Sequence, residues 1–125
     1  MLLISFAAFA QQNTTKTKGE IHAFDAVDVK PTFQGQDAGT FAYWVAHNLK
    51  YPEVAAKNGI CGRVLVEFVV EKDGSITDVK ALKSPDESLS EEAVRVISNS
   101  PEWEPGIVDG KPVRVRYMFP VVFKL

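Results

Sequence analysis

The side chains that could supply a nucleophile and a base are Cys61 and His47, because the chain has one cysteine and two histidines. A thiol enzyme also needs a group that orients the base within hydrogen-bond reach of the thiol. Cys61 stands between Ile60 and Gly62, at the expected entrance of a strand, and nothing around it in the sequence activates a thiol. We therefore interpret Cys61 as a small buried or half-buried apolar residue. His47 is interpreted as an exposed helical residue, and we expect no enzyme.

The other candidates for chemistry are aromatic and metal-binding residues. Trp103 and Tyr51 could form a platform that stacks on a sugar or a peptide, although the rigid turn at 102–106 favours Trp103 as a packing anchor. A single cysteine excludes an internal disulfide and a site built from several cysteines. His22 has no cluster of ligand residues beside it. The net charge of −2 provides no basic surface for nucleic acid, so we expect neither a metal, a cofactor nor a nucleic-acid partner.

A hairpin must form the centre of the domain. Residues 62–72 and 75–82 are rich in β-branched residues and flank Asp73-Gly74, the strongest short-range signal for a two-residue turn with positive φ at both positions. That turn places Glu67 opposite Lys80 and Phe68 opposite Val79. It also predicts one shared face, which needs helices to cover it and consists of Val64, Val66, Phe68, Val70, Thr77, Val79 and Ala81.

Three helical segments surround the hairpin in the sequence. The first is capped by Asp37 or Thr40, and its apolar stripe comprises Phe41, Trp44, Val45 and Leu49. Pro52 ends this segment and opens a short helix at 52–57, with Asn58-Gly59 as its C-cap. The third begins with a capping box formed by Ser88 and Glu91. It is expected to end at Asn99-Ser100-Pro101 and to bury Leu89, Ala93, Val96 and Ile97.

The last segment, 112–125, alternates between apolar and polar positions. One face carries Val113, Val115, Tyr117, Phe119, Val121 and Phe123, and the other carries Arg114, Arg116, Met118, Pro120, Val122 and Lys124. Pro120 has no N–H, so one side of the strand near it must be unpaired. The pattern therefore predicts that the C-terminal strand is a sheet edge.

The chain divides into three parts by composition. Residues 1–10 are apolar and end in Ala8-Phe9-Ala10, which fits the cleavage pattern of an export signal, and they are too few to span a bilayer, which needs about 20. The alternative is an apolar N-terminus without a targeting role. Residues 11–30 are predicted to be a flexible leader in which 20–30 can form a short edge strand. Residues 31–125 form one domain.

Several motifs occur together in a characteristic order. They are Lys50-Tyr51-Pro52-Glu53-Val54-Ala55, Gly59-x-x-Gly62-Arg63-Val64, Val70-Glu71-Lys72-Asp73-Gly74, Ser90-Glu91-Glu92-Ala93-Val94-Arg95, Pro101-Glu102-Trp103-Glu104-Pro105-Gly106 and a closing basic strand. From about Pro31 to Leu125 this order resembles the TonB C-terminal domain. The resemblance implies an α+β, two-layer fold in which a three-stranded antiparallel sheet, made of the hairpin and the C-terminal edge strand, carries two helices on one face.

The resemblance also implies a function. Members of this family grip the TonB box, a short segment of an outer-membrane receptor, by adding it as a strand, and so couple energy to nutrient uptake. We expect the partner to pair along the open side of the last strand, and the partner-binding residues are Arg116, Met118, Pro120, Val122, Lys124 and Tyr51. Four basic residues against one acidic residue in 109–124 favour an acidic partner. The same edge could pair with a second copy and form a homodimer.

Family members also carry a membrane anchor and a proline-rich spacer, whereas the seven prolines of this chain are scattered. We therefore expect an exported, periplasmic protein of the Gram-negative cell envelope with no membrane anchor in this chain. The alternatives to receptor binding are a freestanding periplasmic adaptor and a structural protein that binds the cell wall.

Overall fold

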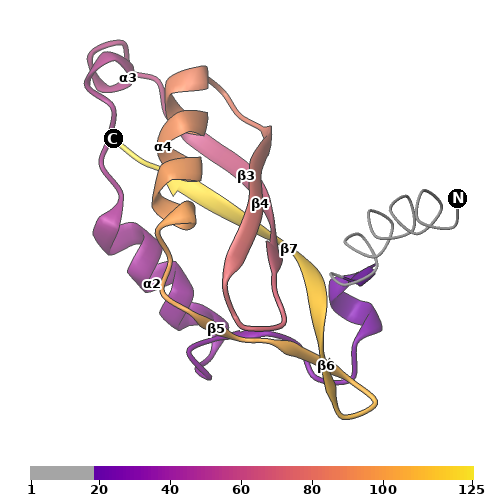
Figure 1. Ribbon diagram of the computed structural model, residues 1–125. Coiled ribbons are helices and arrows are strands. Elements are labelled where there is room, and N and C mark those ends of the chain that lie inside the picture. Colours follow the sequence, from indigo (N-terminus) through magenta and orange to yellow (C-terminus); the bar gives the residue numbers. More distant parts are fainter. Residues whose placement is uncertain (1–18) are drawn as a thin grey trace, which may run out of the picture.

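The computed structural model describes residues 19–125, so the expected export signal at 1–10 lies outside the described residues. Figure 1 shows the order of the elements along the chain. They are β1 (Ile21–His22), the 3-10 helix η1 (Phe24–Ala26), β2 (Thr32–Phe33), α2 (Ala38–Asn48), α3 (Glu53–Lys57), β3 (Gly62–Val70), β4 (Ile76–Lys83), α4 (Glu87–Ser98), β5 (Trp103–Glu104), β6 (Gly106–Val108) and β7 (Lys111–Phe123).

The predicted hairpin is present as β3 and β4, but its turn differs from the expected one. Glu71 N–H donates to the Ser75 carbonyl at 2.8 Å, and Gly74 N–H donates to the Glu71 carbonyl at 2.9 Å. The loop therefore spans residues 72–74, and of its residues only Gly74 has a positive φ, at 88°. A three-residue loop with its last residue in the left-handed region is the next most common hairpin connection. The expectation of a two-residue turn was wrong.

The register of the hairpin is confirmed in the middle and changed near the turn. Glu67 pairs with Lys80 as predicted, whereas Val69 pairs with Thr77 and a register shift separates the two pairs. Asp78 lies in this shift with a φ of 52°, so it is the extra residue of a β-bulge. The predicted pairing of Phe68 with Val79 is therefore absent from the register. The bulge also lets Ile76 pack against the core beside Val79 and Ala81.

The sheet is larger than expected and mixed. Its strand order is β1-β7-β3-β4, with β6 also paired to β7. β3 lies in the centre and pairs with β7 along its whole length, from Gly62–Phe123 to Val70–Val115. β1 runs parallel to β7, so the expected three-stranded antiparallel sheet was incomplete. Strands of two or three residues are too short to leave a period in the sequence.

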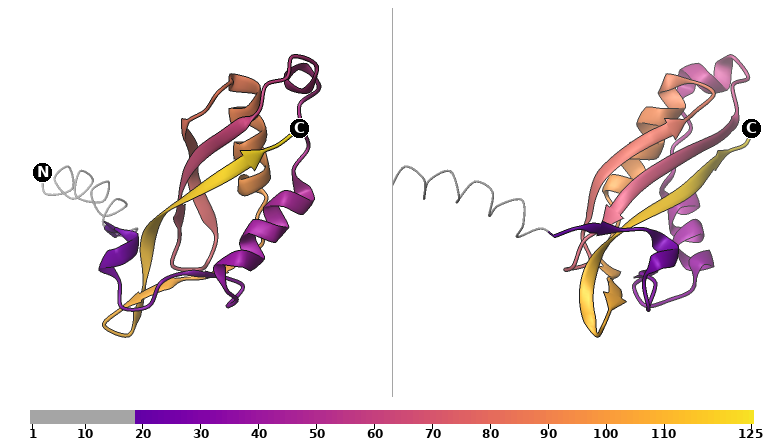
Figure 2. Two further views of the ribbon diagram at one scale, coloured as in Figure 1. Left: turned by 180° about the vertical axis from the view of Figure 1, so that it is seen from behind. Right: turned by 90° about the vertical axis from the view of Figure 1, so that its right-hand side faces the viewer.

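The helices lie on one face of the sheet, as Figure 2 shows for α2 and α4, and residues 19–125 contain three α-helices where the family resemblance implied two. Asp37 caps α2 as predicted, accepting from Thr40 N–H at 3.2 Å. The cap of α4 is Asp86 and not Ser88, because the Asp86 carboxylate accepts from Ser88 N–H at 3.0 Å and the helix already begins at Glu87. An aspartate is as good an N-cap as a serine.

The core between these layers is rich in aromatic rings. Trp103 is 4% exposed, its ring contacts those of Phe41, Phe68 and Tyr117 at centroid distances of 4.8, 5.7 and 5.0 Å, and its Nε1–H donates to Ser100 Oγ at 3.0 Å. The anchor interpretation is confirmed. A stacking platform that includes Trp103 was wrong, because a buried indole cannot take up a ligand from solvent. Of the helical residues expected in the core, Trp44 and Leu49 are only partly buried against it. The others are buried, namely Phe41, Val45, Leu89, Ala93, Val96 and Ile97.

Candidate functional site

β7 has one side paired and one side largely open. β3 follows its inner side from Val115 to Phe123. On the outer side, β1 pairs only with Arg114 and Val115. Within residues 19–125 no strand pairs with the outer side of β7 beyond Val115. A strand side of this kind can take up an extended chain through main-chain hydrogen bonds.

The side chains of β7 alternate almost as the sequence predicted. Tyr117 and Phe119 pack against the core, and Val121 and Phe123 are fully or nearly fully buried. Met118 is 53% exposed and Val122 is 48% exposed. Arg116 and Pro120 are also exposed, as is Lys124 just beyond the end of the strand. Five of the six predicted partner-binding residues therefore lie together along the end of β7.

Arg114 is the exception to this alternation. It is only 8% exposed, because its Nε donates to Glu71 Oε1 at 2.7 Å and its guanidinium also donates to the Gly19 carbonyl at 3.1 Å. The hydrogen bond with Glu71 raises the pKa of Arg114. Sequence reasoning missed this pair because its members are 43 residues apart. Arg114 thus fastens the segment before β1 to β7.

The charge of the strand is lower than its sequence suggests. Arg116 forms an ion pair with Glu67 at 3.5 Å, and the other oxygen of the same carboxylate forms an ion pair with Lys80 at 3.5 Å. Two of the four basic residues counted in the sequence, Arg114 and Arg116, are therefore matched by carboxylates of β3 and its turn. The expectation of an acidic partner loses much of its support, because this end of the sheet carries its own counter-charges.

Tyr51 lies near the end of β7 but is engaged in packing. Its hydroxyl donates to the Ile60 carbonyl, and its ring meets Phe123 edge-on at a centroid distance of 5.5 Å. Cys61 is exposed at the start of β3, so its interpretation as a buried or half-buried residue was wrong. His47 is exposed on α2 as predicted and stacks on Tyr43 at 5.9 Å.

The other edge of the sheet, β4, is irregular. Register shifts interrupt its pairing with β3 at two places, one around Asp78 and one around Leu82. The pairing of β7 with β3 has no such shift. Bulges bend and twist a strand, and proteins use them to prevent pairing at an edge. The outer side of β7 beyond Val115 is therefore the more regular of the two open strand sides.

Among the described residues, no three His, Cys, Asp or Glu side chains lie close enough together to hold a metal ion. No helix in residues 19–125 is long and apolar enough to cross a membrane.

Fold and edge together define a small α+β domain with a mixed curled sheet and one regular open strand. The family model described as Gram-negative bacterial TonB protein C-terminal matches residues 47–125, and the chain belongs to this family. The resemblance seen in the sequence motifs is thereby confirmed.

Relatives and solved structures agree with this assignment. Protein TonB of Vibrio cholerae is 35% identical over 79 residues, which is 61% of this chain and 31% of the relative. Protein TonB of Helicobacter pylori strain J99 is 51% identical over 35 residues, 28% of this chain and 12% of the relative. The matched parts thus span less than a third of these relatives.

Two solution NMR structures show the same fold. A Helicobacter pylori TonB-CTD structure has a TM-score of 0.54 and 25% identity, covering 74% of this chain and 88% of its own. The Pseudomonas aeruginosa TonB CTD has a TM-score of 0.50 and 27% identity, covering 86% of this chain and 96% of its own.

Proposed function

We propose that this chain is a periplasmic protein-binding module that takes up the TonB box of an outer-membrane receptor as an added strand on β7. In this role it takes part in energy-coupled nutrient uptake. Membership of the TonB C-terminal family supports the general role. The observation that carries the specific one is the contrast between the regular, open outer side of β7 and the bulged edge of β4.

The direction of the main-chain groups of β7 follows from its other hairpin. Val108 and Lys111 flank the two-residue turn Asp109-Gly110, in which both φ angles are positive, at 52° and 76°. Such a turn makes its flanking residues a hydrogen-bonded pair, so the N–H and C=O of Lys111 point toward β6. The two groups of one residue share a side, and the sides alternate along the strand. The main-chain N–H and C=O groups of the even-numbered residues of β7 therefore point away from β6.

β6 lies on the same side of β7 as β3. Trp103, three residues before β6, donates its N–H to the Gly74 carbonyl at the tip of the β3–β4 hairpin, at 2.8 Å. The even-numbered residues from Arg116 onward then point their main-chain groups to the open side. Pro120 has no N–H to offer there, and it leaves Arg116, Met118, Val122 and Lys124 as the donors available to an added strand.

Replacement of Val122 by proline tests this arrangement. Val122 is exposed and lies opposite Arg63 on β3, so the variant removes an outward N–H without removing a core side chain. We expect the fold to survive and the affinity for a receptor TonB-box peptide to fall by about tenfold, equivalent to about 1.4 kcal/mol. Isothermal titration calorimetry of the full chain with the peptide measures the change.

Val122→Ala is the matched control, because it trims the side chain and keeps the N–H. It should bind the peptide almost as the unmodified chain does. Collapse of the thermal transition in Val122→Pro would show that the N–H of Val122 pairs inside the sheet. Unchanged peptide affinity in a folded Val122→Pro variant would place the ligand elsewhere and reject the proposal.

The structure bears differently on the two alternatives, a cell-wall-binding protein and a freestanding adaptor. A cell-wall-binding role depended on Trp103 and Tyr51 as a stacking platform, and both rings are engaged in the core. A freestanding adaptor would use the same edge of β7, so the peptide experiment applies to it equally.

A further inference from the structure

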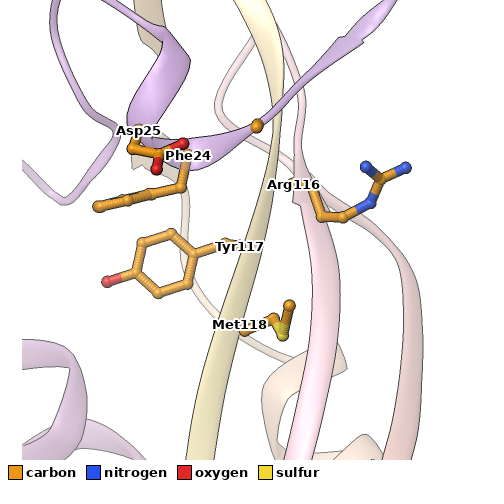
Figure 3. Close-up of a pocket in the computed structure, with 6 residues that line it drawn as sticks. Phe24, Asp25, Arg116, Tyr117 and Met118 are labelled. Atoms are coloured by element: carbon orange, nitrogen blue, oxygen red, sulfur yellow. The ribbon is translucent and has the colours of Figure 1, made fainter.

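A cavity of about 410 Å³ lies where β1 leaves the outer side of β7. Figure 3 shows that Phe24 and Tyr117 lie on one side of the β7 ribbon, while Arg116 and Met118 point to the other. The cavity thus straddles the strand at the point where its open edge begins. Its lining residues are Ala23, Phe24, Asp25, Arg116, Tyr117 and Met118.

Phe24 forms a wall of the cavity that belongs to the leader rather than to the sheet. Its ring stands edge-on to Tyr117 at a centroid distance of 5.0 Å and an angle of 87°. Lys30 Nζ lies 5.5 Å from the centre of the same ring. Phe24 nevertheless remains 36% exposed. A large aromatic ring held in place but left partly uncovered is a surface on which another apolar group can pack.

Tyr117 lies beside Phe24 on the same side of β7 and is fixed by the core. Its ring stacks on Phe68 at 5.3 Å and 21°, and it contacts Trp103 at 5.0 Å. The wall is therefore rigid, whereas Met118 at the rim is 53% exposed and has the conformational freedom to adapt to a ligand.

The position of η1 relative to β7 places the cavity at one end of the open strand side. β1 pairs in parallel with Arg114 and Val115, and the chain then turns into η1 at Phe24. A strand added to β7 from Arg116 onward continues the line of β1 and meets η1 at its end. The leader thus closes one end of the open edge.

We infer that this cavity receives an apolar side chain from the terminal part of the added strand, and that Phe24 thereby determines the register of the bound segment. The inference rests on the proposed function. The occupant is an extended peptide because one wall is the open side of a strand, whose N–H and C=O groups can pair with the main chain of an added strand. The side chain that enters is aliphatic or aromatic, because Phe24, Tyr117 and Met118 supply the contact surface.

Double-mutant cycles between protein and peptide test the inference. The probe is the receptor TonB-box peptide used to test Val122→Pro. It is compared with peptide variants in which each apolar residue of the peptide is changed in turn to alanine. Phe24→Ala should weaken binding of the parent peptide by about fivefold, and at one peptide position the alanine change should then cause no further loss. Tyr43→Ala, which removes an aromatic ring that is 72% exposed on α2, is the control and should couple to no position.

Phe24→Leu is a second variant for the case in which Phe24→Ala detaches the leader from β7. Amide hydrogen exchange at Ile21 and His22 reports whether β1 stays paired, and if Phe24→Ala exposes these amides, Phe24→Leu replaces it in the cycle. Absence of coupling at every peptide position would overturn the inference while leaving the Val122→Pro result intact. A peptide that fails to bind the unmodified chain would reject the proposed function as well. Displacement of the peptide by a second copy of β7, seen as a dimer in sedimentation, would also overturn it.

Discussion

At the scale of single residues, Phe68 shows how the hairpin and the helices depend on one another. It is fully buried on β3, and its ring contacts those of Phe41 on α2 and Tyr117 on β7 at 6.1 and 5.3 Å. Phe68→Ala should lower the free energy of unfolding by about 3 to 5 kcal/mol, the range for aromatic deletions in cores. Urea denaturation measures this, with Tyr43→Ala as an exposed control expected to stay within about 0.5 kcal/mol. A change as small as that of the control would contradict the burial of Phe68.

Burial was predictable where the local sequence pattern determines it, and not where it depends on contacts with residues far away in the sequence. The alternation along β7 placed Met118, Val121, Val122 and Phe123 correctly, because a strand with one buried face imposes a period of two. Arg114 followed the same pattern in the sequence but is buried, since Glu71 on a distant part of the chain supplies its counter-charge. The cavity beside Phe24 was likewise absent from the sequence analysis, because it exists only where the leader crosses β7.

At the scale of elements, two Asp-Gly pairs show how far local sequence determines a turn. Asp109-Gly110 forms the two-residue turn that this dipeptide favours, whereas Asp73-Gly74 forms part of a three-residue loop. The difference lies in tertiary contacts, since the Gly74 carbonyl accepts from Trp103 N–H and a bulge follows at Asp78. The existence of the hairpin was therefore predictable, and the geometry of its turn was not.

The two glycines of these turns should respond differently to alanine. A Cβ on Gly74 would lie 2.0 Å from the backbone oxygen of Trp103, whereas a Cβ on Gly110 would meet nothing within 4 Å. Both positions have a positive φ, so both variants carry backbone strain. Gly110→Ala should lower the free energy of unfolding by about 1 kcal/mol, and Gly74→Ala by about 3 kcal/mol or more. Equal losses in urea denaturation would show that the contact of Gly74 with β5 is not required.

The cap of α4 should make stability depend on pH. Hydrogen bonds from the side chain and backbone of Ser88 lower the pKa of Asp86 below its ordinary value of 3.8. A carboxyl with a lowered folded-state pKa stabilises the fold above its unfolded-state pKa, and this contribution disappears as the pH falls through the folded-state value. Asp86→Ala should therefore be less stable than the unmodified chain at neutral pH, and the difference should shrink below pH 3.8.

Thermal melts from neutral to acid pH measure the difference between the two proteins. Asp86→Asn keeps an acceptor for Ser88 N–H without a titrating group, so it should lose less stability at neutral pH and show little dependence on pH relative to Asp86→Ala. A gap between the unmodified chain and Asp86→Ala that stays constant down to the most acid melt would contradict the role of the charged cap.

At the scale of the whole molecule, the sheet was predictable in its centre and not at its margins. β3, β4 and β7 each carry enough residues for a period of two to show, and their relative order follows from the hairpin and the family pattern. β1, β2, β5 and β6 have two or three residues each. Three of them form because segments before α2 meet segments after α4, as in the pairing of Phe33 with Trp103, and β6 forms a hairpin with β7. Of these short strands, β1 is the one that pairs with the outer side of β7, and it leaves the part beyond Val115 open.

An open, regular strand can also pair with a second copy of itself, and Pro120 lies where it would limit such pairing. Pro120 is exposed and pairs with Leu65 of β3 without a shift in register. Proline on an edge strand removes a donor and protects against association.

Pro120→Val restores an N–H on the open side, so it should favour self-association by about tenfold in the dimer dissociation constant, or about 1.4 kcal/mol. Sedimentation velocity over a range of concentrations measures this constant. Adding Val122→Pro to the same chain removes a neighbouring donor and should return it toward the unmodified behaviour. A Pro120→Val variant that sediments as the unmodified chain does at every concentration would show that a missing donor at residue 120 is not what limits pairing of this edge.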